Sequence, residues 1–138
     1  MRTLHVGLRV ADLDRSLGFY TAVGYEVVGA VPETGIGHLT MLKLPADEFV
    51  SIELVSDPAS GAVELGTGLS HLVVQVEAMD ATVARLATLG IRAVEPVSPD
   101  GSADFLTSWI TDPDGRRIEL VQWPTGHAEG LSAADWAT

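Results

Sequence analysis

The sequence Ile-Glu-Leu-Val occupies residues 52–55 and recurs unchanged at residues 118–121, a shift of 66 positions. At the same shift, a run of apolar residues with the i, i+4, i+7 spacing of one helix face also recurs. A glycine follows each helical pattern, at Gly24 and at Gly90, where a left-handed residue commonly ends a helix. Since these coincidences cover a helix, its end and a strand, they predict a duplicated structural unit.

Each copy of the repeat is predicted to fold as one strand, one helix and three further strands, a βαβββ module. In the first copy the expected elements are, in order, a strand at 4–10, a helix at 14–23, and strands at 25–31, 39–44 and 49–55. In the second copy they are a strand at 70–76, a helix at 80–89, and strands at 91–95, 106–111 and 116–122. The predicted fold class is therefore α+β, with two βαβββ modules in tandem.

The repeat also divides the chain into parts. We expect a first module at 1–56, a linker at 57–69 that is rich in glycine, serine and alanine, a second module at 70–123, and a C-terminal tail at 124–138. A module of roughly 55 residues is marginal for burying a core of its own. The two modules are therefore expected to fold together or across a dimer.

A histidine and a glutamate recur as a pair in the two copies. His5 precedes Glu53 by 48 residues, and His71 precedes Glu119 by the same 48 residues. Successive side chains of a strand face opposite sides of the sheet, so the apolar neighbours of these residues are expected to face the helix. The four polar groups are then expected to project from the other sheet surface, and the same alternation puts Arg9 on the face of His5.

Two imidazoles and two carboxylates form a mixed nitrogen and oxygen donor set, which suits a divalent ion such as nickel, cobalt, zinc, iron or manganese. Such an ion keeps positions for substrate oxygens and acts as a Lewis acid, while a neighbouring carboxylate can remove a proton from carbon. His38 and His127 have no counterpart in the repeat and are expected on the surface or in loops. Trp109 is expected either to line the pocket or to belong to the core.

The composition argues against several classes of protein. The chain has 138 residues, 46% of them hydrophobic, a net charge of −11 and no cysteine. Without cysteine there is no disulfide, thiolate metal site or cysteine nucleophile. The acidic charge argues against nucleic-acid binding, and no apolar run suits a signal peptide or a membrane span, so we expect a cytoplasmic protein. Arg9 is then either the cation that holds an anionic substrate or a solvated surface arginine.

Three stretches carry a resemblance to a known family: MRTLHVGLRV at 1–10, DLDRS at 12–16 with Phe19 and Tyr20, and DPDGRRIEL at 112–120. In these stretches the chain resembles the vicinal oxygen chelate superfamily (glyoxalase, bleomycin resistance protein and extradiol dioxygenase), and within it bacterial glyoxalase I most closely. The similarity covers about residues 1–123.

The resemblance implies a cupped sheet around a divalent metal, usually nickel or zinc, in a homodimer. The implied metal ligands are His5, Glu53, His71 and Glu119. The implied reaction converts the hemithioacetal of methylglyoxal and glutathione to S-lactoylglutathione through an enediolate. Glu119 corresponds to the main catalytic base and Glu53 to a second catalytic carboxylate, while Arg9 corresponds to an arginine that anchors a glutathione carboxylate.

The same superfamily leaves other reactions open. Its members include epimerases, extradiol dioxygenases, thiol transferases and metal-free proteins that bind small molecules. Epimerases often carry glutamine where this chain has Glu53, and the dioxygenases use two histidines and one glutamate, so the complete set of four favours the isomerase. The tail at 124–138 is not typical of glyoxalase I and is compatible with a subgroup that uses another substrate or thiol.

Overall fold

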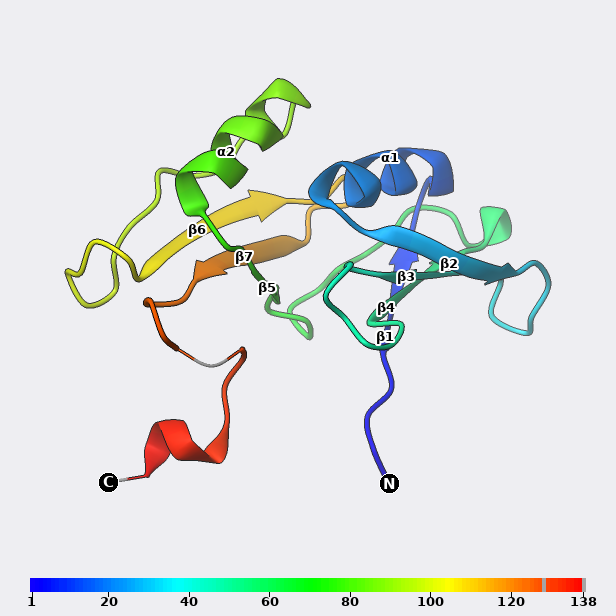
Figure 1. Ribbon diagram of the computed structural model, residues 1–138. Coiled ribbons are helices and arrows are strands. Elements are labelled where there is room, and N and C mark those ends of the chain that lie inside the picture. The colour runs from blue at the N-terminus through cyan, green and yellow to red at the C-terminus, as the bar shows by residue number, and fades with distance from the viewer. Residues whose placement is uncertain (128, 138) are drawn as a thin grey trace. The chain divides into compact units, whose positions relative to one another are not determined.

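The computed structural model describes residues 1–127 and 129–137 (Figure 1). In chain order its elements are β1 (Val6–Val10), α1 (Leu13–Val23), β2 (Glu26–Val31), β3 (His38–Lys43), β4 (Ile52–Ser56), η1 (Pro58–Ser60), β5 (Leu72–Gln75), α2 (Met79–Thr88), β6 (Leu106–Thr111), β7 (Arg117–Gln122) and η2 (Ala133–Trp136). They form two compact units. The first comprises residues 1–70 and 111–116, and the second comprises the rest of the described chain. Among the described residues, none of the helices has the length and apolar character needed to cross a membrane.

The first unit is a four-stranded sheet with α1 on one of its faces (Figure 1). The strand order is β1-β4-β3-β2; β1 pairs in parallel with β4, and β3 is antiparallel to both β4 and β2. Five side chains of these elements are almost completely buried: Leu8 and Val10 of β1, Ile52 and Leu54 of β4, and Tyr20 of α1. The core of this unit is built from alternate strand residues and the helix, as strand alternation predicts.

Helix α1 begins and ends at residues suited to those positions. The side chain of Asp12 caps the helix by accepting a hydrogen bond of 3.0 Å from the backbone N–H of Arg15. At the other end, Gly24 has a φ of 134° and its N–H donates to the carbonyl of Tyr20. The predicted role of Gly24 at the helix end is confirmed, because this backbone conformation favours glycine.

The second unit is a three-stranded sheet of order β5-β7-β6 with α2 packed against it. The N-cap position of α2 is Ala78, which has no polar side chain to offer. Gln122 of β7 takes over the capping, because its Oε1 accepts a hydrogen bond of 2.6 Å from the N–H of Met79. The Nε2 of the same side chain donates to the carbonyl of Asp104 at 2.8 Å. Helix α2 is therefore capped by a residue distant in sequence, whereas α1 is capped by a residue next to its own first turn.

The two units share one pairing register. In the parallel pair β1–β4, Val6 lies opposite Ile52, and in the parallel pair β5–β7, Leu72 lies opposite Ile118. Leu72 follows Val6 by 66 positions, and Ile118 follows Ile52 by the same number, which is the shift of the sequence repeat. The predicted duplication is thus confirmed in the backbone pairing.

The prediction of a strand at 91–95 is wrong. In its place the chain makes single contacts with β6: the N–H of Val94 donates to a β6 carbonyl at 2.9 Å, and Val97 forms an isolated bridge with Thr107. Pro96 stands between these two contacts and has no N–H to donate, so a continuous ladder is interrupted there. The second unit therefore has three paired strands where the first has four.

The C-terminal tail predicted at 124–138 contains the short helix η2; residues 128 and 138 lie outside the described residues. The hydroxyl of Ser132 caps η2, and the carboxylate of Asp135 accepts the N–H of Ser132 at 2.6 Å. That backbone hydrogen bond is the main reason that the pKa of Asp135 is lowered.

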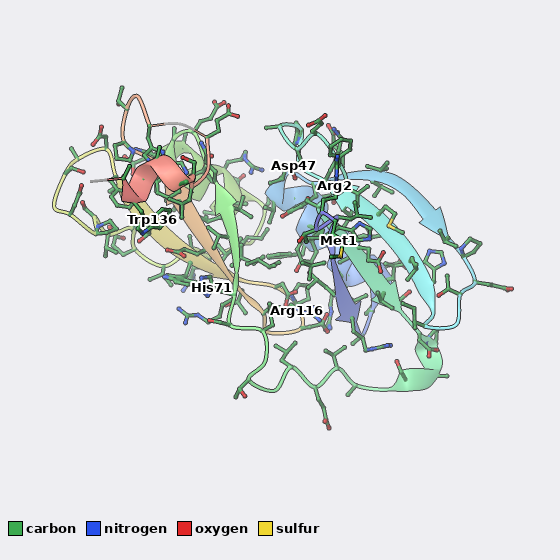
Figure 2. The ribbon with its side chains drawn as sticks, turned by 90° about the horizontal axis from the view of Figure 1, so that it is seen from below. Met1, Arg2, Asp47, His71, Arg116 and Trp136 are labelled. Atoms are coloured by element: carbon green, nitrogen blue, oxygen red, sulfur yellow. The ribbon has the colours of Figure 1, made fainter. Side chains whose placement is uncertain are left out.

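A buried polar network ties the turn at residues 111–116 into the first unit (Figure 2 labels Arg116). Asp112 and Arg116 are 4% and 6% exposed and form an ion pair of 3.1 Å. The Tyr20 hydroxyl donates to Asp112 Oδ2 at 2.7 Å, and Arg116 donates to the carbonyl of Arg9. Burial, and then the hydrogen bond to Asp112, raise the pKa of Tyr20 above its usual range, so the phenol keeps its proton.

Asp112→Ala is expected to lower the free energy of unfolding by about 3–5 kcal/mol. It removes the nearest partner of the buried Arg116 guanidinium, which keeps only the longer contact of 3.6 Å with Asp114, and it leaves the Tyr20 hydroxyl without its acceptor. Urea titration followed by circular dichroism measures the change. Asp80→Ala is the control, since Asp80 is exposed in the first turn of α2, where a carboxylate contributes about 0.3–1 kcal/mol. If Asp112→Ala destabilised the protein no more than the control does, the network would not hold the turn.

Candidate functional site

The first unit brings one of the two predicted pairs together. His5, directly before β1, has its Nε2 2.9 Å from Oε2 of Glu53 on β4. Their side chains are 27% and 13% exposed, while the neighbours of Glu53, Ile52 and Leu54, are buried in the core. The alternation predicted for this strand is confirmed, since the carboxylate faces away from the helix.

The second unit brings the other pair together in the same way. His71 lies directly before β5 (Figure 2), and its Nε2 is 3.5 Å from Oε2 of Glu119 on β7. The two side chains are 33% and 23% exposed, and Ile118 and Leu120 on either side of the glutamate are buried. Both pairs thus consist of one imidazole nitrogen and one carboxylate oxygen on the sheet face opposite the core.

The residue beside each glutamate differs between the units. Gly7 lies opposite Glu53 in the β1–β4 register, and a Cβ atom at Gly7 would be 3.2 Å from Oε1 of that glutamate. In the second unit the matching position is Val73, which lies opposite Glu119 and is 55% exposed. Because Gly7 has no side chain, the Glu53 carboxylate has room to lie close to His5.

In the described part of the chain, no group of three or more histidine, aspartate or glutamate side chains is gathered closely enough to hold a metal ion. Each unit by itself presents a pair. The donor chemistry of each pair fits a divalent transition ion, because imidazole nitrogen and carboxylate oxygen are ligands that such ions accept.

The predicted substrate-binding residues have separate surroundings. Arg9 on β1 is exposed, and its Nη1 donates to the hydroxyl of Ser60 at 3.1 Å. Trp109 on β6 meets the ring of His71 edge to face, with centroids 5.1 Å apart. The guanidinium of Arg117 lies 4.0 Å from the centroid of the Trp109 ring. The indole is therefore in contact with a member of the second pair and is not merely part of the core.

Sequence reasoning missed Arg117. The signal was present, since Arg117 precedes Glu119 by two residues on β7 and alternation puts both on one face. Of the two unmatched histidines, His38 lies on β3, and His127 stacks on Trp123 with ring centroids 4.6 Å apart. His127 also has its Nε2 3.0 Å from Asp135 in the tail.

Comparison with known proteins identifies the family. A sequence profile of the Glyoxalase/Bleomycin resistance protein/Dioxygenase superfamily matches residues 2–120. The lactoylglutathione lyase of Escherichia coli O157:H7 is 30% identical over 125 residues, which cover 88% of this chain and 93% of that enzyme. A probable lactoylglutathione lyase of Synechocystis sp. is 28% identical over 135 residues, which cover 88% of this chain and 95% of the relative.

Among solved structures, the trypanothione-dependent glyoxalase I of Leishmania major is 26% identical with a TM-score of 0.72, and the match covers 88% of this chain and 86% of that one. The chain therefore belongs to the Glyoxalase/Bleomycin resistance protein/Dioxygenase superfamily, and its mixed α+β fold of two small sheets is that of the superfamily. The resemblance drawn from the sequence is confirmed. These relatives support a glyoxalase-like role as an enzyme of this superfamily.

Gly7→Ala is expected to displace the Glu53 carboxylate by a few tenths of an ångström and so to lengthen its contact with His5. Long-range ¹H–¹⁵N spectra should then show shifted ring nitrogens for His5 and unchanged ones for His71. Gly29→Ala is the matched control, because a methyl group there would meet nothing within 4 Å. Unchanged His5 resonances in Gly7→Ala would contradict this account of the first pair.

Proposed function

We propose that the protein is a metal-dependent lyase of the glyoxalase I type. Its substrate is the hemithioacetal of an α-oxoaldehyde and a thiol, such as methylglyoxal with glutathione, and its product is the S-2-hydroxyacyl thioester. The observation that carries this proposal is the repetition of one His–Glu pair in both units, in one register and on the same type of sheet face. Relatives described as lactoylglutathione lyases support it.

We propose that His5, Glu53, His71 and Glu119 together bind one divalent ion, with nickel or zinc as the foremost candidates and cobalt, iron and manganese as others. Two imidazoles and two carboxylates fit such an ion and leave positions for substrate oxygens. When bound, the ion supplies Lewis-acid stabilisation of negative charge on those oxygens.

The chain's own groups carry the proton. In this proposal the Glu119 carboxylate removes the proton from the carbon that bears sulfur, and the neighbouring carbonyl carbon receives a proton in return. The hydroxyl proton of the first carbon passes to the former carbonyl oxygen, so the first carbon becomes the thioester carbonyl and its bond to sulfur stays intact. Glu119 is 23% exposed, which leaves its carboxylate accessible to a substrate. Glu53 is the second catalytic carboxylate. Arg9 binds a carboxylate of the thiol, and Trp109 lines the site beside His71.

We also propose that the working form is a homodimer. In support, all six residues of the edge strand β2 are exposed, and Val27, Val28 and Val31 are 51%, 55% and 42% exposed. Exposed apolar edges of this kind are usually covered by a partner.

Native mass spectrometry of the protein as purified is expected to find a particle of two chains with one divalent ion for each set of four ligands. Chelation should remove the ion and the lyase activity together, and nickel, cobalt or zinc should restore both. His71→Ala should weaken ion binding, whereas His38→Ala, with no counterpart in the repeat, should not. A protein that holds no ion under any of these conditions would instead be a metal-free binding protein.

Glu119→Gln is expected to lower kcat by about 10²–10⁴-fold while the bound ion is largely retained, because the amide can still ligate but cannot accept the proton. The conversion of the methylglyoxal–glutathione adduct to thioester is followed by its ultraviolet absorbance. Glu77→Gln, at an exposed position two residues before α2, is the control and should keep full activity. Wild-type protein inactive with nickel, cobalt and zinc would refute the lyase assignment, and iron-dependent oxygen uptake with a catechol would indicate a dioxygenase.

A further inference from the structure

A line of four side chains in the second unit begins at the proposed base and ends at a cation. Glu119 is 3.5 Å from His71, the His71 ring meets Trp109 at an interplanar angle of 73°, and Arg117 lies over the Trp109 ring at 4.0 Å. Arg117 and Glu119 are two residues apart on β7, which corresponds to about 6.6 Å along a strand. The two side chains therefore start from neighbouring positions on the same sheet face.

The guanidinium of Arg117 is held in position but keeps its hydrogen-bond donors. Its Cζ atom lies over the indole ring, and within the described residues its N–H donors form no hydrogen bond with another group of the protein. Across residues 1–127 and 129–137, no carboxylate forms an ion pair with Arg117. Arg116, by contrast, is paired with Asp112 and is buried. Arg117 is exposed, so a ligand can reach it.

The charge of the protein makes this cation significant. With a net charge of −11, the chain repels anions in general, and a substrate that carries a carboxylate needs a local positive group. A guanidinium whose rotation is already restricted by stacking loses little further entropy when it binds, and its fork matches a carboxylate with two parallel hydrogen bonds. Arg9 supplies a cation in the first unit, whereas its counterpart in the second is the uncharged Gln75.

We propose that Arg117, stacked on Trp109, binds a carboxylate of the substrate and makes the enzyme select anionic substrates. The inference rests on the proposed function for the identity of the site, and it assigns the recognition of charge in the second unit to Arg117. The carboxylate belongs either to the thiol half or to the oxoaldehyde half of the adduct, and the substrates of the test distinguish these two sources.

The test compares wild type, Arg117→Gln and Arg117→Lys on matched adducts. For the thiol half, the adduct of methylglyoxal with glutathione is compared with the adduct of methylglyoxal with glutathione diethyl ester. For the oxoaldehyde half, the adduct of 4,5-dioxopentanoate with the diethyl ester is compared with the adduct of methylglyoxal with the diethyl ester. Arg117→Gln is expected to lower kcat/KM by about 10- to 100-fold, mainly through KM, for the adduct whose carboxylate Arg117 binds, and to leave the matched adduct without that carboxylate unchanged. Arg117→Lys should be intermediate, because it keeps the charge and loses the fork.

Arg92→Gln is the matched control, since Arg92 is an exposed arginine of the same unit and its removal changes the net charge equally. It should leave the rates with all three adducts unchanged. An equal effect of Arg117→Gln on the adducts with and without the carboxylate would overturn the assignment while leaving the lyase function standing.

A binding measurement that needs no turnover separates the two proposals. Isothermal titration calorimetry of the protein as purified is performed with S-methylglutathione, its diethyl ester, 4-oxopentanoate and the methyl ester of 4-oxopentanoate. Wild type should bind one of the acids more tightly than its ester, and Arg117→Gln should abolish that preference. If this holds in a protein without lyase activity, the proposed function fails and the Arg117 site remains; if wild type favours neither acid, the Arg117 site is refuted.

Discussion

Both His–Glu pairs depend on parallel pairing between the first and last strands of a module. In the first unit, β1 and β4 can be aligned only so that Leu8 and Val10 face the helix together with Ile52 and Leu54. A slip of one residue would turn Glu53 into the core and bring apolar side chains to the outer face. The packing that stabilises the sheet therefore also fixes where the carboxylate stands. The same argument applies to β5 and β7, whose register repeats the first at a shift of 66 positions.

The two copies have kept this register and diverged around it. Helix α1 is capped by its own Asp12, whereas α2 receives its capping acceptor from Gln122 on a strand. The absence of a side chain at Gly7 leaves the space that the Glu53 carboxylate fills, whereas Val73 stands at the position beside Glu119. Different residues thus satisfy the same backbone requirements, since a helix end needs a hydrogen-bond acceptor but not a particular one. Divergence of this kind allows one copy to acquire a cation beside its pair without disturbing the shared fold.

Charge is distributed unevenly in this acidic chain, and the few cations have different tasks. Arg116 belongs to a buried network with Asp112 and Asp114, at 3.1 and 3.6 Å, where loss of Asp112 would remove the shorter of its two ion pairs. Arg9 and Arg117 are exposed on strands that also carry or adjoin the proposed ligands. Because the net charge of the chain is −11, an anionic substrate needs a local positive group, and in the proposed site these two guanidinium groups are the candidates. Their separation in sequence, one in each copy, hides that relationship from any single motif.

The sequence by itself determined the repeat, both helices, most strands and the face on which each histidine and glutamate stands, because hydrophobic periodicity records which side of an element is buried. It failed at 91–95, where the apolar pattern resembles a strand but Pro96 interrupts the ladder with β6. Only the tertiary structure decided the contacts between distant elements. These include the distances within each His–Glu pair, the hydrogen bond from Tyr20 to Asp112, and the contact of the Arg117 guanidinium with the Trp109 ring. Periodicity is a property of one element, whereas these contacts depend on the strand register and side-chain rotamers of two.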